Sequence, residues 1–395
     1  MHRCLAISIV VAAACLSGAH AAISVGLTRT QNGSLKNVAK ADQARRALLS
    51  RANSEGATSL PIAQLGYAAY TASIGIGNPP TYYNLLVDSG SSNTWIGGNK
   101  PYVKTSTSVP TGEAVNVSNA GGAFVGSEYY DEVALAPGLI IRNQSIADAT
   151  GAMAPPGVDG IIGFGPVNLT LQTFENNPMQ TIPTVMNNAY AQKIIPEQVL
   201  GVYFAPATSN YSMNGQLTFG GVDESLCVGP IHWTPVTTTK FADLYWGVNI
   251  SASYGRKTLI PATHSGIIDT SSTLTGVLDA WYETYIKAIP GSFFDANVTG
   301  LTAIPESSVK HMHMIAIFVE GQPLLWDVEA QLAPKSLATE LGGESGFRYS
   351  YIVPIGTAFL PGIDFILGMS FIERFYTVSP CFDLMPRSDV EPFWL

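Results

Sequence analysis

The sequence predicts an all-β protein built from two similar lobes. Its 395 residues suffice for two domains, and a hydrophobic content of 46% with only 12% charged residues can fill two sizeable cores. The 38 Gly and 25 Pro residues interrupt short runs rich in Val, Ile, Thr and Tyr, a pattern typical of many short strands rather than long helices. A loop motif that occurs once in each half of the chain indicates the two-lobed arrangement.

The predicted strands follow one another at short spacing from residue 69 onward, as in a β-barrel or sandwich. They cover residues 70–75, 82–88, 128–135, 160–164 and 216–219. Helical periodicity is scarce and best in residues 182–194 and 278–289, and Pro290 ends the second of these segments.

The N-terminus has the composition of a secretory signal. Arg3 precedes an apolar run from residue 5 to residue 16, and small residues follow at 18–21. The run is shorter than the ~18 residues that a membrane span needs, and no later stretch is long and apolar enough to cross a bilayer. We therefore expect residues 1–21 to be a signal peptide and the protein to be secreted, extracellular and free of the membrane.

Residues 22–63 form a basic, helix-prone leader, in which six Lys or Arg residues stand against Asp42 and Glu55. Without residues 1–63 the chain keeps 13 basic and 27 acidic residues, a formal net charge of −14. A basic segment ahead of an acidic body favours a removable propeptide that binds the acidic surface over a disordered basic tail. The acidic body, which has no basic patch, also argues against nucleic acid as a partner.

Two further features of the mature chain are compatible with secretion. Cys4 and Cys15 lie in the predicted signal, so Cys227 and Cys381 remain and can form at most one disulfide bond. The six His residues lack the spacing of a metal site, so we expect no bound metal. We also expect a monomer. Six Asn-x-Ser/Thr sites can carry glycans: Asn116, Asn143, Asn168, Asn210, Asn249 and Asn297.

The repeated motif places an acid at the tip of an apolar strand in each half of the chain. Residues 85–87 lead to Asp88, and residues 266–268 lead to Asp269 in the same way. Each motif is followed by a second apolar strand, which ends at Gly163 or Gly368. An N-terminal lobe of residues 64–230 and a C-terminal lobe of residues 231–395, related by a pseudo-twofold axis, would bring the two Asp loops together.

Two carboxylates held ~3 Å apart cannot both ionise, so such a pair shares one proton. The charged member can deprotonate a water that attacks a carbonyl, while the protonated member donates to the developing oxyanion. Hydroxyl and glycine neighbours suit this chemistry, because they orient the carboxylates without adding charge. These neighbours are Ser89, Gly90 and Ser91 on the first loop and Thr270, Ser271 and Ser272 on the second.

These motifs resemble those of the pepsin-type aspartic endopeptidases, and most of all the secreted polyporopepsin-like enzymes of basidiomycete fungi. The resemblance implies a bilobal fold of two β-barrels, no cofactor, a peptide or protein substrate extended across the cleft, and catalysis by Asp88 and Asp269. Ser91 and Trp95 match positions that hydrogen-bond near the first Asp and support the flap, a hairpin that closes over the substrate. The resemblance covers about residues 64–377 and rests on segments 87–95, 158–163, 217–223, 245–247, 268–270 and 371–376.

The second loop and the flap depart from the family pattern. Ser271 stands where the family has Gly, and a left-handed backbone at this position would cost ~1–2 kcal/mol. At the flap, Asn119 stands where the family has Tyr, and Ala120 stands in place of Gly ahead of Gly121 and Gly122. Because a flap Tyr positions substrate and excludes water, its absence predicts a weaker or altered active site.

The C-terminus departs as well, because an atypical tail after residue 378 replaces the family's final strand and would leave a sheet edge unpaired. Two hypotheses follow. The first is a secreted aspartic endopeptidase, made as a zymogen, that hydrolyses peptide bonds at acidic pH. The alternative is a catalytically impaired pseudoprotease that keeps the cleft to bind peptides or protein partners.

Overall fold

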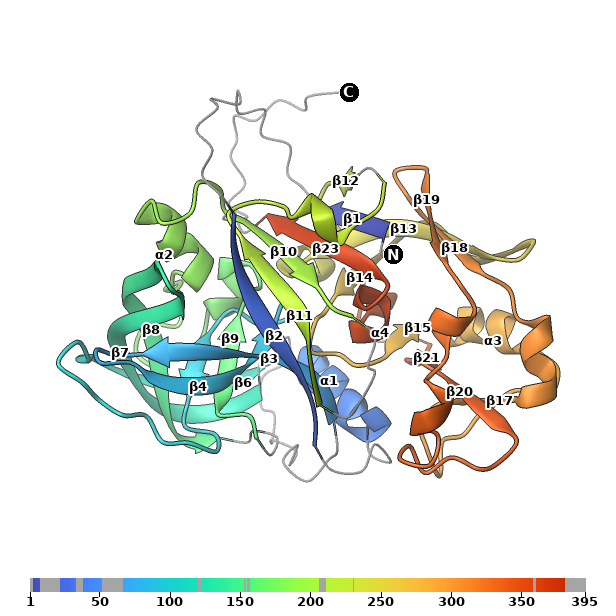
Figure 1. Ribbon diagram of the computed structural model, residues 1–395, viewed down its shortest axis with the longest axis horizontal. Coiled ribbons are helices and arrows are strands. Elements are labelled where there is room, and N and C mark those ends of the chain that lie inside the picture. Colours follow the sequence, from blue (N-terminus) through green and yellow to red (C-terminus); the bar gives the residue numbers. More distant parts are fainter. Residues whose placement is uncertain are drawn as a thin grey trace.

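The computed structural model describes residues 3–7, 22–32, 38–51, 67–119, 122–152, 154, 157–205, 211–229, 231–357 and 360–380. Two lobes lie side by side, with helix α1 between them (Figure 1). The fold is mostly β, as predicted. Among the described residues no helix is long and apolar enough to cross a membrane.

The strands within residues 1–230 are β1 (Arg3–Ile7), β2 (Ile23–Asn32), β3 (Tyr67–Ile76), β4 (Thr81–Asp88), β5 (Thr94–Ile96), β6 (Val109–Asn119), β7 (Gly122–Ala136), β8 (Leu139–Ala152), β9 (Gly160–Gly163), β10 (Val199–Tyr203) and β11 (Tyr211–Phe219). The later strands are β12 (His232–Thr234), β13 (Gly247–Tyr254), β14 (Lys257–Ile268), β15 (Thr275–Val277), β16 (Phe293–Phe294), β17 (Thr302–Pro305), β18 (Ile315–Val319), β19 (Gln322–Trp326), β20 (Phe347–Ser350), β21 (Ile352–Pro354), β22 (Phe365–Leu367) and β23 (Phe375–Pro380). The α-helices are α1 (Val38–Arg51), α2 (Val185–Ala191), α3 (Asp279–Lys287) and α4 (Met369–Ile372).

The N-terminal lobe contains a closed barrel. Strands β3, β4, β9, β5, β8 and β7 pair in that order, and β7 pairs again with β3 to close the ring. The C-terminal lobe holds a seven-stranded sheet in the order β19-β18-β13-β14-β22-β15-β21, together with a three-stranded sheet β16-β17-β20. The barrel belongs to a 13-stranded sheet, in which six further strands run β12-β1-β23-β10-β11-β2 and end against β3, and β6 pairs with β7.

Two strands ahead of the N-terminal lobe join this 13-stranded sheet, β2 from the leader and β1 from the predicted signal peptide. Strand β2 lies antiparallel between β11 and β3, and β1 lies parallel between β12 and β23. In the full chain β23 pairs with β10 on one side and with β1 on the other. Because β1 lies in the predicted signal peptide, removal of that peptide would leave the sheet edge beside β23 unpaired, as the sequence predicts. The predicted ends of the signal and the propeptide, at residues 21 and 63, and the tail 381–395 lie outside the described residues.

The two predicted helices are present but shorter than the periodic segments. Helix α2 begins after Thr184, whose hydroxyl and backbone form a capping box with Asn187. Helix α3 begins after Leu278 and carries Asp279 in its first turn and Lys287 in its last, charges that complement the helix dipole. The cap and the tertiary contacts decide where the helices end.

The internal repeat is visible in the strand pairing. Strand β4 runs parallel to β9, with Asp88 opposite Gly163, and β14 runs parallel to β22, with Ile268 opposite Leu367. A Cβ atom at Gly163 would lie 2.5 Å from the Ser92 backbone, and one at Gly368 would lie 2.5 Å from the Ser272 carbonyl. The two glycines therefore let the second strand of each repeat pass directly against the loop that carries the Asp.

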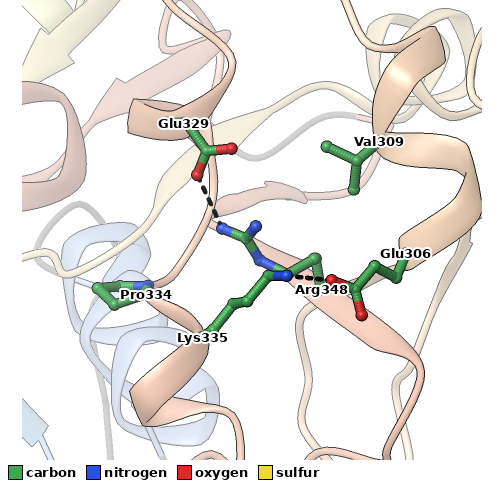
Figure 2. Close-up of a pocket in the computed structure, with 6 residues that line it drawn as sticks. All are labelled: Glu306, Val309, Glu329, Pro334, Lys335 and Arg348. Atoms are coloured by element: carbon green, nitrogen blue, oxygen red, sulfur yellow. Dashed lines mark hydrogen bonds and ion pairs between the residues drawn. The ribbon is translucent and has the colours of Figure 1, made fainter.

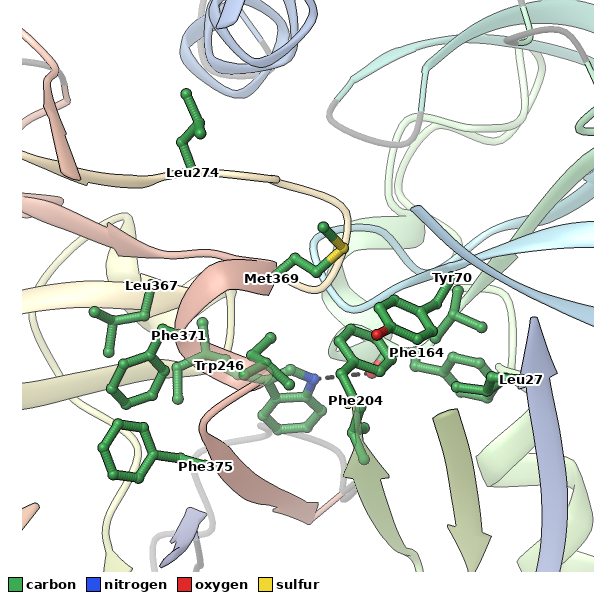
Figure 3. Close-up of a cluster of buried hydrophobic side chains, with 14 of the residues drawn as sticks. Leu27, Tyr70, Phe164, Phe204, Trp246, Leu274, Leu367, Met369, Phe371 and Phe375 are labelled. Carbon is green, nitrogen blue, oxygen red and sulfur yellow. Dashed lines mark hydrogen bonds between the residues drawn. The ribbon is translucent and has the colours of Figure 1, made fainter. Parts of the chain in front are cut away.

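A hydrophobic core joins the lobes beneath these loops (Figure 3). Tyr70 and Phe204 stack with ring centroids 3.8 Å apart on one side. On the other side the buried Trp246 donates from Nε1 to the Phe164 carbonyl at 2.9 Å, a bond between the lobes. Because this core is continuous from one lobe to the other, it determines how the two Asp loops face each other.

Candidate active site

The two Asp residues of the repeat meet between the lobes. Asp88 is the last residue of β4, Asp269 directly follows β14, and both side chains are completely buried. We call this pair the dyad, and the Oδ1 atoms of Asp88 and Asp269 its inner oxygens. Arg45 Nη2 lies 2.7 Å from the inner oxygen of Asp88 and 2.8 Å from that of Asp269, so the two carboxylates converge on one point.

The two Asp loops hold each other through a reciprocal set of hydrogen bonds. The Ser89 backbone N–H donates to Thr270 Oγ1 at 2.8 Å, and the Thr270 N–H donates to Ser89 Oγ at 3.0 Å. Each hydroxyl then donates to a carbonyl on the opposite loop, Thr270 to Val87 at 2.8 Å and Ser89 to Ile268 at 3.2 Å. All four groups are buried, and this set makes the relative position of the loops rigid.

Each carboxylate is oriented by its own loop in the same way. Gly90 N donates to Asp88 Oδ1 at 2.8 Å, and Ser91 Oγ donates to Asp88 Oδ2 at 2.5 Å. On the second loop Ser271 N donates to Asp269 Oδ1 at 3.2 Å, and Ser272 Oγ donates to Asp269 Oδ2 at 2.6 Å. The structure thus brings together all eight residues that the sequence predicts for the catalytic loops.

Ser271 fits its position without backbone strain. The described non-glycine residues with positive φ are Asn143, Gln172, Lys193, Phe241 and Glu320, so the left-handed conformation considered for Ser271 does not occur. Its hydroxyl lies 2.9 Å from Asp88 Oδ1 and 3.1 Å from Asp269 Oδ1. The Ser therefore keeps the backbone N–H bond of the loop and adds a hydroxyl that contacts both carboxylates.

Helix α1 of the leader lies over the dyad. Besides the two Nη2 contacts, Arg45 Nε donates to Asp269 Oδ2 at 2.8 Å. One turn earlier on the helix, buried Asp42 accepts from the Thr273 backbone N–H at 2.6 Å and pairs with Arg46 at 3.3 Å. The helix is thereby bound to the second Asp loop as well as to the carboxylates.

Arg45 dominates the electrostatics of the dyad. Burial by itself raises the pKa of Asp269, but the charge and hydrogen bonds of Arg45, with those of Ser272 and the Ser271 N–H, hold that pKa below its ordinary value of 3.8. Burial lowers the pKa of Arg45, but the charges of Asp269 and Asp88 raise it above its ordinary value. With Arg45 in place the structure therefore favours the ionised form of Asp269.

The sequence did not single out Arg45. It appeared there as one of six basic residues in the leader, and the prediction went no further than binding of that leader to an acidic surface. The one available signal was a basic, helix-prone segment ahead of a pair of acids, which does not say which cation meets them.

The predicted flap is the hairpin of β6 and β7. Asn119 pairs with Gly122 at its end, while Ala120, Gly121 and the side chain of Asn119 lie outside what the structure describes. Trp95 is buried and stacks on Phe124 of this hairpin, with ring centroids 5.2 Å apart. Trp95 thus packs against the hairpin, and its role in supporting the flap stays a prediction.

A pocket in the C-terminal lobe is lined by none of these residues and is not part of this site (Figure 2). It is lined by Val309, Pro334 and two ion pairs, in which Lys335 binds Glu306 and Arg348 Nη2 binds Glu329 at 3.1 Å. Each cation of the pocket is already paired with a carboxylate, so the pocket presents little net charge to a ligand. Elsewhere, Cys227 forms a disulfide bond, while Cys381 lies outside the described residues, and a bond between the two stays a prediction.

Comparison with known proteins agrees with this geometry. Residues 69–385 match the family model described as eukaryotic aspartyl protease. The chain is 42% identical over 309 residues to polyporopepsin from Irpex lacteus, which covers 78% of this chain and 90% of that protein. It is 27% identical over 342 residues to gastricsin from Cavia porcellus, covering 79% and 77% respectively.

A solved structure shares the fold. The crystal structure of the aspartic proteinase from Irpex lacteus superposes with a TM-score of 0.77 at 38% sequence identity, covering 91% of this chain and 94% of that one. The two buried Asp residues, the repeat that presents them and these similarities lead to one conclusion: the chain belongs to the eukaryotic aspartyl protease family and is an aspartic-type endopeptidase.

Proposed function

We propose that this protein is a secreted endopeptidase that works at acidic pH and is made as a zymogen, with residues 22–63 as its propeptide. The observation that carries the proposal is the position of Arg45, whose Nη2 atom lies within 2.8 Å of both inner oxygens. A cation at this point neutralises the carboxylates and fills the place between them, so the full chain is inactive until the leader is removed.

In the processed enzyme a water takes the place between the carboxylates. With one proton shared by the dyad, the ionised Asp accepts a proton from this water as its oxygen attacks the peptide carbonyl. The protonated Asp donates to the carbonyl oxygen, which becomes the oxyanion of a tetrahedral intermediate. Transfer of a proton to the amide nitrogen then breaks the C–N bond and releases the two peptide products.

Acid releases the leader by the following linkage. Docking of α1 lowers the pKa of Asp269. The docked state is therefore stabilised at pH values above 3.8, the ordinary pKa, and loses this stabilisation as the pH falls through the lowered pKa of the docked state. Protonation of the dyad removes the partners of a buried Arg45, and a buried cation without a partner is strongly unfavourable. The same protonation prepares the dyad for catalysis, so release and activation occur together.

The test is self-processing of the full chain. The secreted protein is incubated between about pH 3 and 5, where a shared proton is expected, and its N-terminus is sequenced before and after. We expect cleavage within or close to residues 52–66, activity on a denatured protein substrate, inhibition by a statine-type compound, and loss of activity in both Asp88→Asn and Asp269→Asn.

Arg45→Gln separates the role of the leader from that of the dyad. This variant should process itself faster and at higher pH than wild type, because the Arg45 pairs no longer hold the leader. Lys40→Gln is the matched control, because Lys40 is an exposed cation on the same helix. Equal processing of Arg45→Gln and wild type would contradict the zymogen role.

The alternative, a pseudoprotease, is decided by the same preparation. A processed chain that binds a statine-type inhibitor but cleaves no substrate at any pH would indicate that function. The intact loop geometry around Ser271 supports the active enzyme, because the Ser271 N–H still donates to Asp269 at 3.2 Å.

A further inference from the structure

Ser271 adds to the dyad a group that its counterpart in the first loop lacks. Gly90 and Ser271 occupy equivalent positions, because the N–H of each donates to the inner oxygen of its own Asp. Only Ser271 carries a hydroxyl, and this hydroxyl lies 2.9 Å from one inner oxygen and 3.1 Å from the other. The near-symmetrical dyad therefore has one asymmetric component.

The asymmetry has a steric basis. A Cβ atom at Gly90 would lie 2.6 Å from Arg45 Nη2 and 2.9 Å from Asp269 Oδ1, closer than a real Cβ approaches such atoms. At Ser271 the side chain fits, with an ordinary backbone conformation and hydrogen-bond distances to both carboxylates. The space around the dyad therefore admits a side chain on the second loop and excludes one on the first.

We propose that Ser271 is a positioning residue whose hydroxyl bridges the inner oxygens of the dyad and holds its shared proton between them. A hydroxyl has one O–H donor and two acceptor lone pairs. It can accept the proton of the protonated carboxyl and at the same time donate its own proton to the ionised carboxylate. Both contacts in the structure are then satisfied in the singly protonated dyad.

This bridge also provides a route for exchanging the roles of acid and base. The O–H bond of the protonated Asp269 breaks as its proton passes to Ser271 Oγ, and the Ser271 O–H bond breaks as that proton passes to the Asp88 carboxylate. The outcome is an ionised Asp269, a protonated Asp88 and an unchanged Ser271. No other reactant is needed, because one proton enters the hydroxyl and one leaves it.

The role of Ser271 becomes larger when the leader is removed. In the full chain Arg45 Nη2 donates to both inner oxygens. Once Arg45 has left, the donors to these oxygens among the described residues are the N–H groups of Gly90 and Ser271 and the Ser271 hydroxyl. Of these, the hydroxyl reaches both carboxylates.

Few other charged or titratable groups face the dyad. Asp42 and Arg45 act on it from α1, with Arg46 paired to Asp42, and all three leave with the leader. Tyr245, buried on the C-terminal lobe, also lies within electrostatic range, and burial raises the pKa of its hydroxyl, so it stays neutral in acid. In the processed enzyme a change at Ser271 should therefore act on the pH profile through the pKa values of the dyad.

The inference rests on the proposed peptidase activity, and its first test is the pH profile of kcat/KM for the processed enzyme. The bridging hydroxyl satisfies both contacts only in the singly protonated dyad, so its removal destabilises this state relative to the fully protonated and the fully ionised dyad. In Ser271→Ala and Ser271→Gly we expect a narrower profile, in which the acidic limb moves to higher pH and the alkaline limb to lower pH by about one unit each. The kcat should fall more than KM changes, and Ser271→Thr, which keeps the hydroxyl, should restore the wild-type limbs.

Ser265→Ala is the matched control. Ser265 is a buried hydroxyl on β14 of the same lobe that bonds Asn249 at 2.5 Å and does not touch the dyad, so its loss should leave both limbs in place. A Ser271→Ala profile that superposes on wild type, or a Ser271→Gly enzyme faster than wild type at every pH, would overturn the proposal.

A stability measurement tests the bridge without relying on activity. If no cleavage is found, only the proposed function fails, and this measurement still decides whether Ser271 bridges the dyad. In the full chain the free energy of unfolding is compared for wild type and Ser271→Ala, each with the native dyad and with both Asp88→Asn and Asp269→Asn, between about pH 3 and 7. We expect the loss caused by Ser271→Ala to grow with pH when both Asp residues are present and to be independent of pH when both are Asn. A loss that does not depend on pH in either background would refute the bridge.

Discussion

Glu128 on β7 should make the N-terminal lobe less stable as pH rises. Its carboxyl group is buried, and Oε1 accepts a hydrogen bond from Ser145 at 2.6 Å. The other oxygen, Oε2, is buried without a hydrogen-bond partner among the described residues. Burial raises the pKa of Glu128 from 4.5 to about 7, against the smaller, opposite effect of the Ser145 bond.

The magnitude follows from the two pKa values. Below pH 4.5 the carboxyl group is protonated in both the folded and the unfolded chain, so stability does not depend on pH through this group. Between pH 4.5 and 7 the unfolded chain releases the proton first, so stability falls with pH. A difference of 2.5 units corresponds to about 3 kcal/mol, which is lost in full above about pH 7.

Glu128→Gln should remove this pH dependence, because a Gln amide has the shape of the protonated carboxyl group and can still accept from Ser145. The assay is urea unfolding of the full chain followed by Trp fluorescence from about pH 4 to 8, in an Asp88→Asn background that prevents self-cleavage. We expect similar stability at pH 4 and a Gln variant that is more stable by about 3 kcal/mol at pH 8.

Glu175→Gln is the control, because Glu175 is an exposed acid of the same lobe and its replacement should leave the pH dependence of wild type unchanged. If Glu128→Gln lost as much stability as wild type between pH 5 and 8, burial of this carboxyl group would not be the cause. The same holds if the Gln variant were less stable than wild type at pH 8.

Two further predictions concern the joint between the lobes. Thr270→Val should lower the free energy of unfolding by about 2 to 4 kcal/mol and lower kcat, because it leaves the Val87 carbonyl and the Ser89 N–H buried without their hydrogen-bond partner. Thr270→Ser, which keeps the hydroxyl, should retain most of the stability and most of the activity. Urea unfolding and peptide cleavage measure the two effects, and a Thr270→Val variant as stable and active as wild type would contradict the role of these hydrogen bonds. Trp246→Phe should lower the free energy of unfolding by about 1 to 3 kcal/mol, because it removes the 2.9 Å hydrogen bond to the Phe164 carbonyl. The pH profile of activity should not change. An unfolding curve identical to that of wild type would show that this hydrogen bond does not couple the lobes.

Much of the fold follows from local pattern. The predicted strand 82–88 is observed as β4 (Thr81–Asp88), and the predicted helix 278–289 is observed as α3 (Asp279–Lys287). These segments carry their own signals in apolar alternation, helical spacing and a terminating Pro. Their ends were less accurate, because caps such as Thr184 and pairing with neighbouring strands decide where a segment stops.

The structure of the flap follows less directly from the sequence. The hairpin β6 and β7 is longer than the predicted strand 128–135, because pairing with β8 extends regular structure through Gly-rich sequence. The identity of Asn119 is plain in the sequence, but the consequence of replacing Tyr depends on contacts with a substrate. That question belongs to the activity measurements proposed above.

The sequence by itself determined that two similar lobes each present an Asp at a strand tip, because each copy of the motif is local and the repeat is exact enough to be recognised. It could not determine which side chains contact the two Asp residues. Arg45 lies 43 residues from Asp88 and 224 from Asp269, and Ser271 lies 183 residues from Asp88. Only the tertiary structure decides such contacts, because they depend on how a leader helix and two lobes pack together. The packing places a cation between the carboxylates and a hydroxyl across them.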